Sequence, residues 1–255
     1  MEQAELPNGM AKPLNVETRQ ETRPLVPDGN IAGAPGDETK GEPSGSGQGS
    51  SAGSAPTPRA EEIAYSMFPR YIGKADVVVE VGANRGGATL FLSEIARFVY
   101  AFEPNPSVFE QLKRHIAVRP NVEVYNLGAG AKPETARFNV PPPGAETDTF
   151  GSRYVVSGGS YVSEIEVKIV RLDDLSYLLD PTVLVFDCEG SEVAALDGAE
   201  RLLGARGVHT VIAEMHYLAD GSDTIGPTTD RLRKHDLRIE SVTAPDGSPW
   251  VVGRR

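Results

Sequence analysis

The strongest constraint on the fold is the alternation of short β-branched runs with helical patterns over residues 76–252. Strands that alternate with helices form a mainly parallel sheet, because each crossover helix returns the chain to the same end of the sheet. Such a sheet carries helices on both faces. The strand-like runs are 76–81, 98–102, 122–127, 183–186, 208–215, 237–242 and 250–252, and helical patterns occupy 89–96, 107–116, 193–203 and 228–235.

One interval breaks this alternation. Residues 131–172 contain β-type segments at 138–140, 154–156 and 164–171, separated by runs that are rich in Pro and Gly. Strand-like segments that follow one another without a helix pair as antiparallel hairpins. The sequence therefore predicts a β-hairpin inserted before the fourth strand of the main sheet.

Residues 1–58 have the composition of a disordered tail. Gly and Pro account for 17 of the first 59 residues, which include no Phe, Trp or Tyr. Such a segment buries too little apolar area to offset the entropy that ordering would cost. We therefore predict a disordered Gly/Pro/Ser-rich tail over residues 1–58 and one folded domain over residues 59–255.

Charge and composition limit the partners that this chain can have. The formal net charge of −11 opposes binding of nucleic acid or of an anionic membrane through a general basic surface. No apolar run approaches the roughly 18 residues of a membrane-spanning helix. The single cysteine, Cys188, excludes an intramolecular disulfide and fits a reducing cytoplasm, which is the predicted location. Its alternation with the neighbouring acids predicts that Cys188 packs into the core.

The first strand runs from Glu80 into a turn with glycines at positions 82, 86 and 87, directly before a helix. Glycine lets the backbone approach a ligand closely, and the helix N-terminus offers free N–H groups. The second strand ends at Glu103, 21 residues after Gly82, where an acid can accept both hydroxyls of a ribose. Together these features predict a cofactor that contains a nucleoside.

Two classes of cofactor are bound by a glycine turn after the first strand together with an acid at the end of the second. A nicotinamide dinucleotide needs the pattern G-x-G-x-x-G, but Asn84 stands at the second glycine position. The turn therefore favours a smaller cofactor with an amino-acid end, and Glu80 is near enough to receive its ammonium group. A nicotinamide-dependent oxidoreductase is the second hypothesis, and a non-catalytic cofactor-binding protein is the third.

Ionisable side chains follow the fourth and fifth strands. Asp187 and Glu189 come after the run 183–186, Glu214 lies at the end of the run 208–215, and His216 follows that run directly. The two-residue period of a strand places each pair on one side, so we expect the four groups to converge at one sheet edge as a catalytic site. His216 has an ordinary pKa near neutrality and is the expected base. The same oxygens and imidazole suit Mg²⁺ or Mn²⁺, although carboxylates at a sheet edge also act without metal.

A further acid, Glu192, falls in the first turn of the helix that follows the fourth strand. A negative charge is favourable at a helix N-terminus. For Glu192 this structural role is at least as good an interpretation as a catalytic one.

Five motifs stand in the order found in the FkbM-type S-adenosylmethionine-dependent methyltransferases, which the sequence resembles from about residue 75 to residue 217. They are residues 80–86, 101–106, 172–175, 187–192 and 214–216. The resemblance implies an α/β, Rossmann-like class I methyltransferase fold, in which the sheet has seven mostly parallel strands and the last strand is antiparallel. It also implies methyl transfer from S-adenosylmethionine to a hydroxyl of a small-molecule acceptor, such as a sugar or polyketide.

The same resemblance assigns roles to the motif residues. Asp187 would lie beside the transferred methyl group, where it can orient the cofactor or the acceptor. The residues implied to line the methionine end are Glu80, Gly82, Asn84 and Gly86, and Glu103 is implied to hold the ribose.

Overall fold

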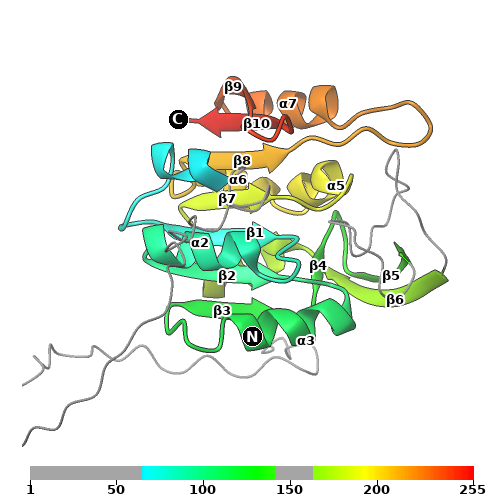
Figure 1. Ribbon diagram of the computed structural model, residues 1–255. Coiled ribbons are helices and arrows are strands. Elements are labelled where there is room, and N and C mark those ends of the chain that lie inside the picture. Colours follow the sequence, from blue (N-terminus) through cyan, green and yellow to red (C-terminus); the bar gives the residue numbers. More distant parts are fainter. Residues whose placement is uncertain (1–64, 142–162) are drawn as a thin grey trace, which may run out of the picture. The chain divides into compact units, whose positions relative to one another are not determined.

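The computed structural model describes residues 65–141 and 163–255. Its main sheet has seven strands in the order β3-β2-β1-β7-β8-β10-β9 (Figure 1). Neighbouring strands from β3 to β8 are parallel, and β10 is antiparallel to both β8 and β9. The strands are β1 Val77–Val81, β2 Phe98–Phe102, β3 Val122–Tyr125, β7 Val183–Phe186, β8 Thr210–Glu214, β9 Arg238–Thr243 and β10 Pro249–Arg254. The predicted α/β fold with an antiparallel last strand is confirmed.

Helices cover both faces of this sheet (Figure 1). Val78 and Val79 of β1 point to opposite faces, and both side chains are completely buried. On one face Val78 packs in a cluster with Phe68 and Leu92. The helices are η1 Tyr65–Arg70, α2 Gly87–Ile95, α3 Pro106–His115, η2 Leu172–Leu175, α4 Ser176–Leu179, α5 Glu192–Asp197, α6 Glu200–Gly204 and α7 Ile225–Lys234. None of the helices in the described residues is both long and apolar enough to cross a membrane.

A second sheet of three strands interrupts the alternation. It consists of β4 Gly128–Ala129, β6 Ser163–Val170 and β5 Glu134–Val140, in that spatial order. The antiparallel pairing of β5 with β6 confirms the predicted hairpin, whereas the parallel pairing of β4 with β6 was not expected. The predicted strand 154–156 and the predicted tail lie outside the described residues, so both stay predictions.

The predicted single helix over residues 193–203 is wrong, because the chain forms two short helices, α5 and α6, that Gly198 and Ala199 separate. The backbone just after β4 approaches the chain here: a Cβ atom on Gly198 would lie 2.0 Å from the carbonyl oxygen of Gly130. The carbonyl of Gly198 also accepts a hydrogen bond from the N–H of Asp173, at 2.9 Å. Tertiary contacts thus end α5 where local helical periodicity would continue it.

Asp173, from the predicted motif 172–175, explains how α6 begins. Its side chain is completely buried, and its carboxylate accepts the backbone N–H of Arg201 at 3.0 and 3.1 Å and that of Leu202 at 3.1 Å. Arg171 adds an ion pair at 3.3 Å. A carboxylate at a helix N-terminus satisfies donors that have no partner within the helix. The structure gives this motif residue a capping role.

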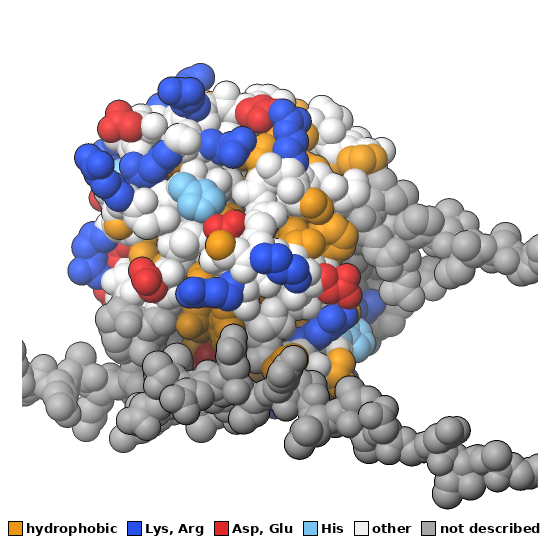
Figure 2. Space-filling model, turned by 90° about the vertical axis from the view of Figure 1, so that its left-hand side faces the viewer, with side chains coloured by type: hydrophobic (Ala, Val, Ile, Leu, Met, Phe, Trp, Pro, Cys, Tyr) orange, Lys and Arg blue, Asp and Glu red, His pale blue; other side chains and the backbone are white. Residues whose placement is uncertain are grey.

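Charge is distributed unevenly over the molecule. Figure 2 shows the side on which the parallel strands begin, and many Lys and Arg side chains lie across it. The overall net charge of −11 therefore does not describe this side. The acids Asp187 and Glu214 lie at the opposite ends of β7 and β8. The exclusion of nucleic acid stays a prediction.

Candidate active site

The glycine turn after β1 lies against the end of β7. Gly82 has a φ of +91°, and a Cβ atom there would lie 1.7 Å from the carbonyl oxygen of Asp187. Gly86 has a φ of +94° and is the N-cap of α2, while Asn84 has a φ of +50°. Positive φ is costly for residues with side chains, and Asn tolerates it better than most. The sequence places glycine where the backbone needs it, and Gly82 brings the turn beside Asp187.

Glu80 is buried at the end of β1, with 2% of its surface exposed. The hydroxyl of Thr89, from α2, donates a 2.7 Å hydrogen bond to its Oε2 atom. Burial raises the pKa of Glu80 to about 7, although the Thr89 hydrogen bond opposes the rise. Ionising an isolated buried carboxyl group costs free energy, and a bound cation beside it would offset that cost.

Glu103 follows β2 and is also buried, with 6% exposure. Its Oε2 atom accepts the N–H of Asn84 at 2.9 Å, and its Oε1 atom accepts the N–H of Asn105 at 2.7 Å. Burial raises the pKa of Glu103 to about 7, against the lowering effect of these two bonds. A carboxylate has about four acceptor sites, so each oxygen can take a further donor. Glu103 therefore joins the turns after β1 and β2, and each of its oxygens keeps an acceptor position beyond these two bonds.

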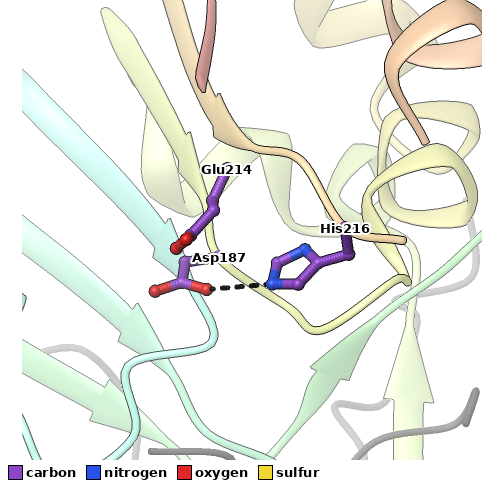
Figure 3. A group of neighbouring side chains, drawn as sticks. All are labelled: Asp187, Glu214 and His216. Carbon is purple, nitrogen blue, oxygen red and sulfur yellow. Dashed lines mark ion pairs between the residues drawn. The ribbon is translucent and has the colours of Figure 1, made fainter. Parts of the chain in front are cut away.

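Three side chains converge where β7 and β8 end. Figure 3 shows Asp187 and Glu214 side by side, with the His216 ring facing Asp187. One ligand-type atom from each of the three lies within 4.8 Å of the others. The Nε2 atom of His216 is 3.9 Å from Oδ1 of Asp187 and 3.5 Å from Oε2 of Glu189. The structure therefore brings together all four side chains that the sequence placed at this edge.

The other ring nitrogen of His216 faces a residue that sequence reasoning left undecided. Its Nδ1 atom is 3.1 Å from Oε1 of Glu192, whose side chain is completely buried at the first residue of α5. A helix-start acid satisfies a local rule, so the sequence carried no signal that Glu192 reaches a residue just after β8. Only the pairing of β7 with β8 brings the two side chains together.

Electrostatics in this cluster differ from what residue types alone suggest. Burial lowers the pKa of His216, but the contact with Glu192 and the charges of Asp187 and Glu189 outweigh it and raise the pKa to about 9. The surroundings in the folded chain therefore move the pKa of His216 away from the ordinary histidine value on which the sequence argument relied. Burial raises the pKa of Glu214 to about 7, and burial with the Glu214 charge raises that of Asp187 well above its usual range. The cluster thus stabilises positive charge.

Cys188 lies between these acids in sequence but is half-buried rather than packed into the core. Burial and the charge of Glu192 raise the pKa of its thiol well above the usual range. The thiolate is the nucleophilic form of cysteine. Cys188 is therefore not an activated nucleophile.

The family is decided by the match over residues 80–238 to the family model described as the methyltransferase FkbM domain. The chain belongs to the FkbM methyltransferase family. It is an S-adenosylmethionine-dependent methyltransferase, which decides against both alternative functions, the nicotinamide-dependent oxidoreductase and the non-catalytic protein. The match contains the glycine turn, Glu103 and the cluster at the ends of β7 and β8.

This FkbM-family methyltransferase is similar to three further proteins. The hexuronic acid methyltransferase AglP of Haloferax volcanii is 29% identical over 77% of this chain and 78% of its own length. A crystal structure of methyltransferase FkbM from Methylobacillus flagellatus has a TM-score of 0.52 at 17% identity and covers 76% of this chain, which spans only 48% of that protein. That likeness shows that the two proteins share a fold. Ribosomal RNA small subunit methyltransferase A of Rubrobacter xylanophilus is 43% identical over 54 residues, which are 21% of each chain.

Proposed function

We propose that this methyltransferase methylates a hydroxyl oxygen of a small saccharide acceptor. The observation that carries the proposal is the cluster of Asp187, Glu214 and His216 beside the glycine turn, because alcohol methylation needs a group that removes a proton next to the methyl donor. The relative that acts on a hexuronic acid, by its name, supports a saccharide as the class of acceptor.

The two buried acids Glu80 and Glu103 suit S-adenosylmethionine as a ligand. Glu80 and Glu103 are acceptors, and the cofactor presents donors to match them: an ammonium group and two ribose hydroxyls. When bound, S-adenosylmethionine supplies a methyl group on a sulfonium, an electrophile that an alcohol oxygen can displace. We assign Glu80, Gly82, Asn84 and Gly86 to the methionine end and Glu103 to the ribose.

His216 is the proposed base, and Asp187 orients the acceptor beside it. The Nε2 atom of His216 faces Asp187 and Glu189, so a proton that arrives there forms an imidazolium between carboxylates. Glu192 stabilises the same charge from the Nδ1 side. Glu214 adds a further carboxylate next to Asp187 (Figure 3). These residues provide a proton acceptor and stabilise its charged form.

A transfer assay with S-adenosylmethionine labelled in the methyl group tests this proposal. The acceptors would be a uronic acid disaccharide, a neutral disaccharide, a polyketide alcohol and ribosomal RNA. We expect label on a saccharide hydroxyl, as an ether that survives mild alkali. Label that alkali releases would instead indicate a methyl ester on the uronic carboxylate, and label on RNA alone would contradict a small-molecule acceptor.

Replacing Glu103 by alanine is expected to weaken S-adenosylmethionine binding at least tenfold. Hydrogen bonds to a charged group contribute about 1.5–3 kcal/mol each, and the ribose offers two. Calorimetric titration would measure the change. Glu110→Ala, on the exposed side of α3, is the control with unchanged affinity.

Because Glu103 also holds the N–H groups of Asn84 and Asn105, its variant needs a second measurement. Thermal unfolding of Glu103→Ala and of the more conservative Glu103→Gln separates loss of affinity from loss of structure. Wild-type affinity in a folded Glu103→Ala variant would contradict the ribose role.

The cluster also offers a donor set for a divalent metal, since carboxylate oxygens and one imidazole suit Mg²⁺ or Mn²⁺. The base mechanism predicts that turnover survives dialysis against EDTA, because none of its steps needs a cation. Loss of turnover that Mg²⁺ or Mn²⁺ restores would assign Asp187, Glu214 and His216 to a metal. Binding of S-adenosylmethionine to the EDTA-treated enzyme is the control for an intact fold.

A further inference from the structure

Resting on the proposed role of His216, we propose that Glu192 is its positioning residue: it holds Nδ1 and thereby leaves Nε2 as the nitrogen that reacts. The Nδ1 atom lies 3.1 Å from Oε1 of Glu192, whose side chain is completely shielded from solvent, as an ion-pair contact. This ring nitrogen is itself buried and has no hydrogen-bond partner among the described residues, so the Glu192 carboxylate is the group placed to receive its proton. A carboxylate at Nδ1 fixes both the orientation of the ring and the nitrogen that carries the proton.

The same oxygen of Glu192 also holds the turn that carries the acids. Oε1 accepts the backbone N–H of Cys188 at 3.2 Å and that of Gly190 at 3.1 Å. This turn is strained at Glu189, which has a φ of +52° although it carries a side chain. Gly190, at a φ of +89°, adopts the left-handed region that glycine allows. Glu192 therefore places Asp187 and Glu189 relative to the ring that they face.

The backbone of His216 is held from a third element. Thr224 precedes α7 and is 2% exposed; its Oγ1 accepts the N–H of His216 at 3.0 Å, and its own N–H donates to the His216 carbonyl at 3.1 Å. Thr224 fixes where the residue lies, but it leaves the ring free to rotate about χ1 and χ2. Among these contacts, Glu192 is the one that decides which ring nitrogen faces Asp187.

The test compares Glu192→Gln with Glu200→Gln. Both acids are the first residue of a helix, but Glu200 is exposed and pairs with Lys234. We expect Glu192→Gln to lower kcat by roughly 10–100-fold, the usual effect of losing an orienting partner. The KM for S-adenosylmethionine should stay within about twofold, and Glu200→Gln should match the wild type.

A double-mutant cycle distinguishes positioning from a general structural effect. If Glu192 acts through the ring, Glu192→Gln should cause no further loss of kcat in a His216→Ala background. Equal losses in both backgrounds would overturn the proposal, as would wild-type kcat in the single variant.

A spectroscopic measurement makes the outcome independent of activity. Nitrogen chemical shifts of the His216 ring, recorded on ¹⁵N-histidine-labelled protein well above pH 9, where the ring is neutral, should show its single ring proton on Nδ1 in the wild type. In Glu192→Gln the proton should instead be shared between Nδ1 and Nε2 as a mixture of two tautomers. A wild-type ring that is protonated on Nε2 would overturn the proposal even if methyl transfer is confirmed. If no acceptor is methylated, the Nδ1 assignment still stands or falls on these spectra.

Discussion

His216→Ala is expected to lower turnover by roughly 10²–10⁴-fold, the range contributed by a positioned general base. Affinity for S-adenosylmethionine should be nearly unchanged, because the loss falls on proton removal from the acceptor. Steady-state kinetics and calorimetry measure the two quantities. His235→Ala, a half-buried residue after α7, serves as the control with wild-type turnover.

The same role for His216 also predicts how kcat/KM depends on pH. The pKa of His216 is raised to about 9 in the ligand-free protein, so the ring is protonated at pH 7 and must lose its proton to act as a base. The value of kcat/KM, which reports the free enzyme, should therefore rise as the pH increases from 7 towards 9. The rise should disappear in His216→Ala. Wild-type turnover in that variant, or a collapse of cofactor binding, would contradict the base role.

Gly82→Ala is expected to be the most destabilising single substitution in the cofactor turn. The added Cβ atom would lie 1.7 Å from the carbonyl oxygen of Asp187, and backbone atoms cannot move aside as a flexible side chain can. The left-handed φ of +91° adds about 1–2 kcal/mol. We expect a total loss above ~4 kcal/mol in the free energy of unfolding, which denaturant titration would measure.

Two other glycines make this prediction quantitative. Gly247 has a φ of +95° but open space around it, so Gly247→Ala isolates the conformational cost of about 1–2 kcal/mol. The loss of unfolding free energy in Gly86→Ala should lie between those of Gly247→Ala and Gly82→Ala. Its Cβ atom would lie 2.8 Å from the end of the Leu112 side chain, which can shift. Equal losses for Gly82→Ala and Gly247→Ala would show that the turn can move away from β7.

Local periodicity predicted most of the main sheet because each of its strands is a separate apolar run between breaks. The runs 98–102 and 183–186 match β2 and β7 at both ends. The predicted helix 193–203 failed because Gly198 meets the backbone of Gly130, a contact 68 residues away that helical periodicity does not encode. The pairing of β4 with β6 was missed for the same reason, since two residues carry no strand pattern.

The sequence by itself determined which ionisable residues lie together at one edge of the sheet. Acids and a histidine that end consecutive parallel strands share one sheet edge, so Asp187, Glu189, Glu214 and His216 could be placed together from their spacing alone. Tertiary structure alone decided how these groups behave. It buried Glu192 against His216, which moved the pKa of the imidazole to about 9. Burial and the distance between charges set a pKa, and neither is fixed until β7 and β8 have paired and α5 has packed beside them.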